Sequence, residues 1–371
     1  MYISFFKIAT DCIKILKKIL HLLNISHIWS MSESKEITIY DIATRLKLSP
    51  TTVSRALNNN PAISKATRLL VNDTALQLGY RSNSIASSLR TKKTNTIGVI
   101  VQRLNSNFMA SVLSGMENIA NKEGYNLIIS QSLEKADKEK ENALNMFNTR
   151  VDGLLASLSY DTEDISHFDT FIKKGLPVVF FDRVPPNENC LNVIIDNYRN
   201  GYEATKHLIE QGCKNILHVT GNLKRNVYAE RFRGYRDALK EADLKFNETL
   251  LIINDLSDQS GINVAKEILS RSKRPDGLFI TNDTCAVFCM KTLRKEGIKV
   301  PKDIAIVGFN NDPIGFVAEP NLTTINYPGQ VMGEIAAGRL IAYLNGKYDI
   351  KNTNTIVVRS ELIIRESSMR K

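Results

Sequence analysis

From residue 96 onward, short hydrophobic runs alternate with amphipathic stretches of helix length. The runs are rich in valine, isoleucine and leucine, which is typical of strands buried on both faces of a parallel sheet. Strands are therefore predicted at residues 96–101, 126–131, 153–158, 177–182, 192–196, 215–221, 249–255, 277–282 and 303–309. Because the pattern restarts near residue 215, we expect two α/β lobes in succession, each a parallel sheet flanked by helices.

Upstream of residue 96, the spacing of apolar positions predicts three short helices. They are expected at residues 39–46, 50–58 and 64–78. Ser49 and Ser64 are suitable N-caps, Pro50 suits the first position of a helix, and Gly79 suits a helix end. The inward side chains of the second and third helices are expected to be Val53, Ala56, Leu57, Leu70, Val71, Ala75 and Leu78.

Polar side chains share the outward face of the second helix, namely Thr51, Ser54, Arg55 and Asn58. Two short helices joined by a tight turn and braced by a third are typical of a helix-turn-helix module. Threonine and arginine at the start of an exposed helix can reach base edges, and hydroxyl and amide groups can bind phosphate oxygens. The alternative at this point is a small helical bundle with a solvated polar face.

The distribution of charge favours a polyanion as the partner of this module. The chain carries a net charge of +10, and residues 35–94 hold ten Lys or Arg residues against three acidic ones. Residues 95–371 are almost balanced, with 35 basic and 34 acidic side chains. A basic module attached to a neutral body suggests that only the module meets the polyanion, although a solvated charged face would give the same count.

Composition and motifs narrow the class of protein. A hydrophobic share of 43% and a charged share of 24% are those of an ordinary globular protein. Five scattered cysteines without CxxC spacing indicate neither disulfides nor a zinc site, and they fit a reducing cytoplasm. The sequence contains no GxSxG, P-loop, GxGxxG or HExxH motif, and its histidines do not cluster. We therefore predict no catalytic residues, no cofactor and no metal.

The first 30 residues are apolar with helical spacing and carry lysines on the other face. Their longest run without Lys, Arg, Asp or Glu, residues 19–32, falls short of the roughly 20 apolar residues that a membrane span needs. The stretch also lacks the small-residue cleavage site of a secretory signal. We expect an extension upstream of a true start at Met31.

The string T-I-Y-D-I-A-x-x-L-x-L-S-x-T-T-V-S-R-A-L-N, followed by I-S-x-x-T-R and L-G-Y-x-S-N-x-I-A-S-S-L-R, resembles the head of the lactose repressor (LacI/GalR) family. The resemblance continues over about residues 37–367. It implies a homodimer that places its recognition helices in successive major grooves of operator DNA. The residues that match backbone-binding or bracing positions of the family are Thr38, Tyr40, Ser49, Thr52, Ser54, Asn58 and Ser64. Those that match base-choosing positions are Pro50, Thr51 and Arg55.

Residues 83–90 resemble the hinge helix of the same family, which forms on operator DNA. The resemblance implies that Leu89 enters the minor groove, and that Asn83 and Ala86 belong to the same DNA-binding segment. A side chain that unstacks a base step bends the duplex. A helix this short and rich in serine should be marginal without DNA.

Polar side chains also follow the predicted strands at their carboxyl ends, where a ligand would bind between two lobes. The predicted effector-binding residues are Asn107, Phe108, Asp182, Arg183, Arg225, Arg231, Leu256, Asn282, Asp283 and Asn310. Further candidates at strand ends are Asn105, Asn222, Asp255 and Asp312. Carboxylates, amides and arginines beside an aromatic ring suit a polyhydroxyl ligand such as a sugar.

The family resemblance refines this expectation. Arg231 matches the arginine with which most relatives hold the effector, whereas Asn310 replaces an aspartate of many members. Leu256 replaces the aromatic ring of some sugar-binding members. These two departures argue against a simple galactoside or a purine.

The sequence as a whole predicts a cytoplasmic, ligand-responsive transcription regulator, a repressor that binds a palindromic operator as a dimer and changes its DNA affinity when a sugar-like molecule binds. The predicted parts are an extension (1–34), a helix-turn-helix domain (35–82), a hinge and linker (83–95), and a core like the periplasmic binding proteins (96–371). Within the core, the N-lobe is expected at about 96–195 plus 328–347, and the C-lobe at about 196–327 plus 354–367. A sugar receptor of the periplasmic type without DNA function and a sugar-processing enzyme are the alternatives.

Overall fold

The structure, a computed structural model, describes residues 36–80, 93–186, 190–350 and 353–370. The predicted N-terminal extension and hinge helix, with Asn83, Ala86 and Leu89, lie outside these residues. The chain divides into two compact units, Met1–Ser87 and Ser88–Lys371, each with its own hydrophobic core.

The first unit contains the three predicted helices, α2 (Ile39–Leu46), α3 (Pro50–Leu57) and α4 (Lys65–Leu78). The Oγ of Ser49 accepts a hydrogen bond from the backbone N–H of Thr52 (3.1 Å), and Ser64 caps α4 in the same way. Lys47 and Gly79 adopt left-handed φ values of 51° and 66°, which end α2 and α4. The buried core of this unit comprises Ile42, Ala43, Val53, Ala56, Val71 and Ala75.

One predicted core position of this unit is wrong. The side chain of Leu70 is 53% exposed, whereas Thr74 is buried. The Oγ1 of Thr74 donates a hydrogen bond to the carbonyl oxygen of Leu70 (2.8 Å), so the hydroxyl is satisfied within the helix and its methyl group can pack inward.

The second unit contains two parallel sheets and a short antiparallel pair. The first sheet has the strand order β11-β5-β4-β3-β1-β2, the second has the order β7-β6-β8-β9, and β10 pairs with β12. The strands are β1 (Thr96–Val101), β2 (Asn126–Gln131), β3 (Gly153–Ala156), β4 (Val178–Phe181), β5 (Leu191–Ile195), β6 (Ile216–Thr220), β7 (Leu251–Ile253), β8 (Gly277–Ile280), β9 (Ala305–Val307), β10 (Thr324–Asn326), β11 (Thr355–Val358) and β12 (Glu361–Ile363).

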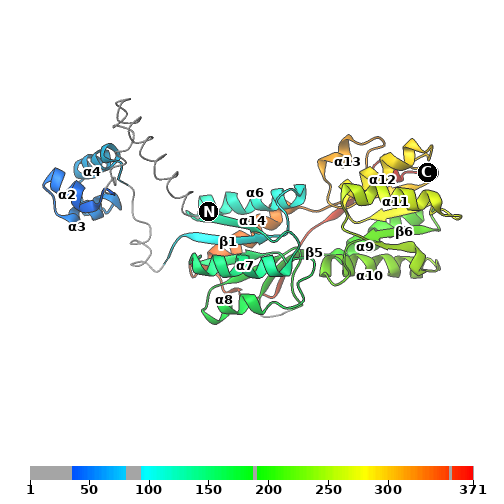
Figure 1. Cartoon of the computed structure of the whole chain (residues 1–371), viewed down its shortest axis with the longest axis horizontal. Helices are drawn as coiled ribbons and strands as arrows, with labels where there is room; N and C mark the ends of the chain where they lie inside the picture. The colour runs from blue at the N-terminus through cyan, green and yellow to red at the C-terminus, as the bar shows by residue number, and fades with distance from the viewer. Residues whose placement is uncertain (1–35, 81–92, 187–189, 351–352, 371) are drawn as a thin grey trace, which may run out of the picture. The chain divides into compact units, whose positions relative to one another are not determined.

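Helices cover both faces of each parallel sheet, so each sheet with its helices forms one lobe. Figure 1 shows α6 (Asn107–Lys122) and α14 (Gly329–Leu344) on one face of the first sheet, and α7 (Ala136–Asn148) and α8 (Asp169–Lys173) on the other. In the second lobe, one face is covered by α11 (Asp258–Ser270) and α12 (Asp283–Lys295), and the other by α9 (Asn197–Glu210) and α10 (Asn226–Glu241). Among the described residues, the remaining elements of this unit are the short helix α13 (Pro313–Val317) and the 3₁₀ turns Ser166–Phe168, Glu248–Leu250 and Glu366–Ser368.

The nine predicted strands all occur, with ends that shift by a few residues. β7 and β9 each lose two residues at both ends, and in β7 this is because Asn247 caps a 3₁₀ turn that occupies the beginning of the predicted strand. The pattern did not reveal β10, β11 and β12, which have three or four residues each.

One of the missed strands corrects the expected division into lobes. Residues 355–358 were assigned to the C-lobe, but β11 pairs in parallel with β5, from Thr355 opposite Asn192 to Val358 opposite Ile195. The strand therefore belongs to the first sheet. The chain passes between the lobes three times, namely from β5 to α9, from β10 to α14 and from β11 to β12.

Candidate functional site

The helix-turn-helix unit presents an exposed polar face on α3. Thr51, Arg55 and Asn58 are exposed and lie at intervals of four and three residues, which places them on one side of the helix. Within the described part of the chain, no hydrogen bond or ion pair engages the Arg55 side chain. Its guanidinium therefore has all its N–H groups available for a partner.

Most of the other predicted DNA-binding residues take part in holding the unit together. Thr38 donates its backbone N–H to the Asp41 carboxylate (2.8 Å), and Asn58 donates its amide to the carbonyl oxygen of Ser54 (2.7 Å). The hydroxyl groups of Ser49 and Thr52 are 2.8 Å apart. Tyr40 differs from these residues, because its ring is 66% exposed.

A cavity of about 420 Å³ lies between the two lobes of the second unit, at the carboxyl ends of their strands. Eight of the ten predicted effector-binding residues line it: Asn107, Phe108, Asp182, Arg183, Arg231, Leu256, Asn282 and Asn310. Three of the further candidates, Asn105, Asp255 and Asp312, also line it. Residues far apart in the sequence thus meet around one space.

Arg225 and Asp283, which were also predicted to bind the effector, do not line this cavity. The guanidinium of Arg225 donates to the carbonyl oxygen of Thr162 instead. Asp283 is fully buried and accepts hydrogen bonds from the Asp312 backbone N–H and the Thr324 hydroxyl, both at 2.7 Å. Both side chains therefore bond to backbone or hydroxyl groups of the protein itself.

Arg231, on α10, is the most deeply enclosed cation of the cavity, with 3% of its surface exposed. Its Nε donates to the Oδ1 of Asn197 (2.8 Å) and its Nη1 to the carbonyl oxygen of Thr281 (3.4 Å). The guanidinium carbon lies 3.5 Å from the centroid of the Phe309 ring. Burial lowers the pKa of Arg231. The remaining N–H groups can donate to ligand oxygens.

Close contact between α9 and α10 fixes the position of Arg231. A Cβ atom on Gly201 would lie 2.2 Å from the carbonyl oxygen of Arg231, and one on Gly234 would lie 2.2 Å from that of Tyr198. Only glycine allows the two backbones to approach so closely. Arg231 therefore projects from a rigid helix pair.

Asp182 follows β4 and faces the cavity with both carboxylate oxygens already engaged. The Tyr327 hydroxyl donates to Oδ1 (2.7 Å), and the Ser157 hydroxyl donates to Oδ2 (3.3 Å). Burial and the Asp182 charge raise the pKa of Tyr327 well above its ordinary value. The Tyr327 ring stacks on Phe108 with centroids 4.1 Å apart, which gives the cavity an aromatic wall.

Arg183 forms a second charged group at the cavity. Its Nη1 pairs with the Glu134 carboxylate (2.7 Å), and its Nη2 donates to the Tyr228 hydroxyl (3.0 Å). The sequence pattern did not point to Glu134 or Tyr228, although both line the cavity. Tyr228 stands one helical turn before Arg231, and that spacing is the signal that could have identified it.

Several cavity residues have unusual backbone conformations. The φ values of Asp182 and Leu256 are both 58°, and that of Asn310 is 124°. Side chains other than glycine rarely adopt this region, and such strain gathers at ligand sites. Three residues of this kind around one cavity favour a binding role.

The described residues contain no group of three or more His, Cys, Asp or Glu side chains that could hold a metal ion. None of the helices in the described ranges is long and apolar enough to cross a membrane.

Comparisons with known proteins agree with this two-part organisation. Residues 38–83 match the family described as bacterial regulatory proteins, lacI family, and residues 205–368 match a periplasmic binding protein-like domain. The catabolite control protein A of Priestia megaterium is 33% identical over 83% of this chain and 93% of its own length. The ribose operon repressor of Haemophilus influenzae is 30% identical over 89% of this chain and 98% of its own length.

Solved structures have the same fold. A lac repressor dimer bound to operator and the anti-inducer ONPF has a TM-score of 0.81 and 22% identity, over 90% of this chain and all of that one. A complex of the transcriptional regulator CelR with cellobiose has a TM-score of 0.68 and 28% identity, over 90% of this chain and all of that one.

Proposed function

Because the chain belongs to the lacI family of bacterial regulatory proteins, whose members are transcription regulators rather than enzymes, we propose that it is a repressor. Its affinity for operator DNA changes when a small molecule binds. The observation that carries the proposal is the pairing of two features in one chain. One is the exposed α3 face with an unengaged Arg55, and the other is the polar cavity between two lobes. The protein acts in the cytoplasm, where its DNA is.

The proposed DNA interface is the outward face of α3. Thr51 and Arg55 read base edges. Pro50 is the first residue of α3, directly after the turn. The polar residues that cap and brace the helices bind the DNA backbone. Two copies of this face, one helical turn of DNA apart, read a palindromic site. The hinge residues 83–90 would add minor-groove contacts.

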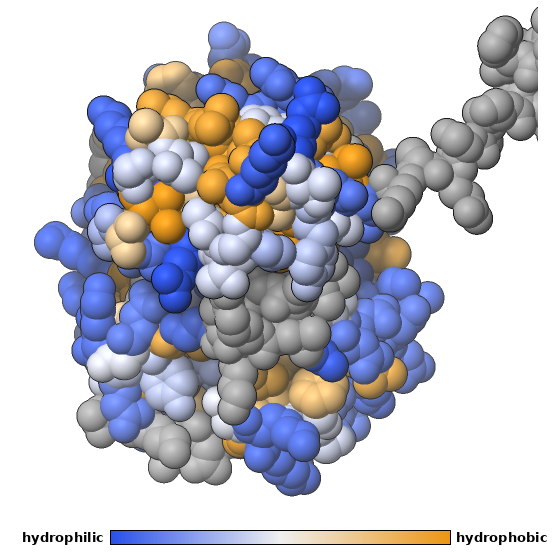
Figure 2. Space-filling view, turned by 90° about the vertical axis from the view of Figure 1, so that its left-hand side faces the viewer, coloured by the Kyte–Doolittle hydropathy of each residue, from blue (hydrophilic) through white to orange (hydrophobic). Residues whose placement is uncertain are grey.

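We propose that the chain forms a homodimer. The edge strand β2 of the first sheet and the segments that follow β1 and β2 carry apolar side chains that are 36–48% exposed: Ile128 and Ile129 on β2, Leu104 after β1 and Leu133 after β2. An exposed sheet edge with apolar side chains is a surface that proteins normally cover. Figure 2 shows hydrophobic side chains that reach the surface among hydrophilic ones. The lac repressor structure with the same fold is a dimer.

The proposed effector is a sugar or a similar polyhydroxyl molecule. The cavity offers donors from Arg231 and Asn282, acceptors from Asp312 and Asn310, and the aromatic wall of Phe108. Paired donors and acceptors beside an aromatic face match the alternating hydroxyl and C–H surfaces of a sugar. Two relatives are regulators named for ribose or solved with cellobiose.

The DNA part of the proposal is tested by selecting preferred sites from random duplex DNA with the full chain. Arg55→Ala should weaken binding to the selected site by about 1–3 kcal/mol and relax base choice at one position of each half-site. Lys65→Ala is the matched control, because Lys65 is an exposed cation of the same unit outside α3. It should leave base preference unchanged. If Arg55→Ala weakened selected and random DNA equally, Arg55 would not read a base.

The effector part is tested with a panel of sugars in a thermal-shift screen, followed by operator affinity with and without each sugar that stabilises the protein. Arg231→Ala should keep the sugar-free affinity for the operator but lose the response. Arg233→Ala is the control, because Arg233 is an exposed arginine on the same helix that pairs with Glu230. A normal response from Arg231→Ala would place the effector elsewhere.

A further inference from the structure

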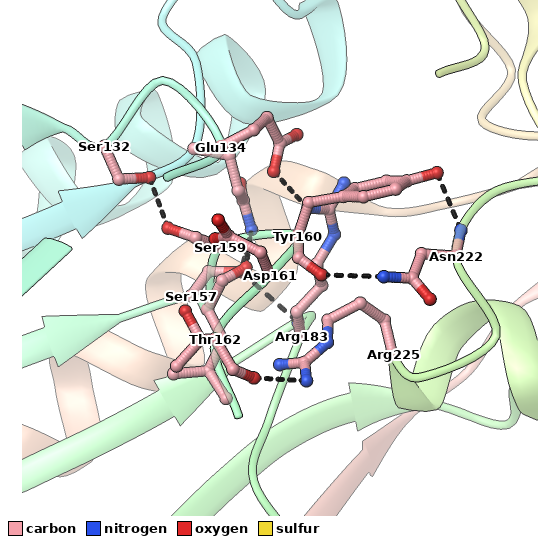
Figure 3. A network of polar contacts seen from close by, with 12 residues as sticks. Ser132, Glu134, Ser157, Ser159, Tyr160, Asp161, Thr162, Arg183, Asn222 and Arg225 are labelled. Carbon is pink, nitrogen blue, oxygen red and sulfur yellow. Dashed lines mark hydrogen bonds and ion pairs between the residues drawn. The ribbon is translucent and has the colours of Figure 1, made fainter. Parts of the chain in front are cut away.

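A loop of the first lobe reaches across to the second lobe beside the cavity. This loop, residues 157–163 after β3, is called here the clasp loop (Figure 3). The Tyr160 hydroxyl donates to the carbonyl oxygen of Asn254 (2.8 Å) and accepts from the backbone N–H of Asn222 (2.7 Å). The carbonyl oxygen of Tyr160 accepts from the Asn222 side-chain amide (3.0 Å). One residue of the first lobe thus makes three hydrogen bonds to the second.

The clasp loop is held firmly on its own lobe by the carboxylate of Glu139, which is fully buried on α7. One carboxylate oxygen accepts from the Ser159 backbone N–H (2.6 Å) and hydroxyl (2.8 Å). The other accepts from the Thr162 hydroxyl (3.1 Å) and contacts the His167 Nε2 (3.0 Å). Hydrogen bonds to a buried carboxylate are strong, so the loop moves with the first lobe. Its bonds to Asn222 and Asn254 therefore resist separation of the lobes.

The second lobe is shaped to receive the Tyr160 ring. A Cβ atom on Gly221 would lie 2.7 Å from the Tyr160 hydroxyl oxygen and 2.5 Å from the Tyr228 ring. The guanidinium of Arg225 donates to the Thr162 carbonyl oxygen at the other end of the loop. Glycine at position 221 is thus what allows the hydroxyl to approach the second lobe.

Tyr160 also connects this contact to the cavity, although it does not line it. The guanidinium carbon of Arg183 lies 5.4 Å from the ring centroids of both Tyr160 and Tyr228. The two rings lie side by side, with centroids 6.0 Å apart, and a guanidinium near the faces of both is attracted to both. Arg183 and Tyr228 line the cavity, so a shift of Tyr160 would move two groups that face the ligand space.

We propose that Tyr160 is a positioning residue that holds the lobes together without a ligand and orients Arg183 and Tyr228. The fraction of closed protein sets the apparent affinity of any ligand that needs the closed lobes. Only this consequence for effector binding rests on the proposed function. The closure itself is a property of the chain and can be measured without DNA or effector.

The test is Tyr160→Phe in the full chain, which removes the hydroxyl and keeps the ring. Spin labels are attached at Lys138→Cys on α7 and Lys266→Cys on α11, two exposed positions on different lobes. Cys190, Cys213, Cys285 and Cys289 are buried, and Cys12→Ser removes the remaining thiol. Labelled protein is diluted with unlabelled protein, so that each distance arises within one chain.

We expect Tyr160→Phe to raise the ratio of open to closed lobes about tenfold, as the loss of two hydrogen bonds implies. Hydrogen exchange at residues 221–226 should rise with it. Tyr202→Phe is the control, because the Tyr202 hydroxyl bonds to Glu241 within the second lobe (2.6 Å). It should leave the distances unchanged.

Gly221→Ala places a methyl group of the second lobe against the Tyr160 hydroxyl. It should open the lobes as well, so the test does not depend on one variant. Unchanged distances in both Tyr160→Phe and Gly221→Ala would overturn the proposal. The same would follow if Tyr202→Phe opened the lobes as much as Tyr160→Phe.

Discussion

Replacing His218 with phenylalanine should make the second unit more resistant to mild acid. His218 lies on β6 with no exposed surface, and its ring stacks on Tyr235 with centroids 4.8 Å apart. The ring of Phe279 lies at the same distance on another side. Neither ring nitrogen of His218 has a well-formed hydrogen bond to another described residue. Burial lowers its pKa from an ordinary 6.5 to about 3.

The lowered pKa fixes the sign of the effect. The folded protein keeps the ring neutral down to about pH 3, whereas the unfolded chain takes up a proton below pH 6.5. The stability linked to His218 is therefore complete above pH 6.5 and is lost as the pH falls toward 3. At about 1.36 kcal/mol per pH unit, the loss between pH 7.5 and pH 5 is about 2 kcal/mol.

The assay is urea unfolding of the parent chain and of His218→Phe at pH 7.5 and pH 5. The free energy of unfolding of the variant relative to the parent should rise by about 2 kcal/mol on going to pH 5. Tyr235→Phe is the control, because it alters the same aromatic cluster and removes a hydrogen bond to Ile216 without a group that titrates in this range. Its difference from the parent should be the same at both pH values. If the difference in unfolding free energy between His218→Phe and the parent were the same at both pH values, the conclusion that His218 is a buried neutral ring would be refuted.

Three further predictions concern the stability of the second unit. Burial raises the pKa of Asp283 to about 7, so the stability linked to it is complete below its ordinary pKa and is lost as the pH rises through 7. The melting temperature of the parent relative to Asp283→Asn should therefore fall between pH 5 and pH 8, and a constant difference would contradict this. Gly201→Ala should destabilise the chain by roughly 1–3 kcal/mol, because its Cβ would meet the Arg231 carbonyl oxygen at 2.2 Å. Gly338→Ala on α14 meets nothing within 4 Å, and thermal unfolding should show it to be neutral or slightly stabilising.

The helix-turn-helix unit was predictable because its signals are local. Ser49, Ser64 and Gly79 mark helix ends through bonds to residues three or four positions away. The exception shows the limit of such signals. Leu70 and Thr74 lie on the same side of α4, and a sequence pattern ranks leucine as the inner residue. In the structure, the packing of the three helices buries Thr74 and leaves Leu70 exposed.

The cavity was predictable in outline, because parallel strands bring their carboxyl ends to one edge. Its details depend on contacts distant in sequence. Asn282 and Asp283 are consecutive polar residues, but Asn282 caps α12 at the cavity while Asp283 turns to Thr324, 41 residues away. Tyr327 was missed because it follows β10, a three-residue strand defined by pairing with β12, 35 or more residues away in the sequence.

The threefold passage of the chain between the lobes restricts how new ligand specificity can arise. The first sheet takes its edge strand β11 from the far end of the chain, and α14 packs on the same lobe from beyond the whole second lobe. A recombination event that exchanged residues 96–195 with a relative would join a foreign sheet to the original α14 and β11. Such a hybrid would have to repack its interior before it could bind anything. Inherited change in this protein should therefore accumulate through single substitutions on the cavity wall rather than through exchange of contiguous segments.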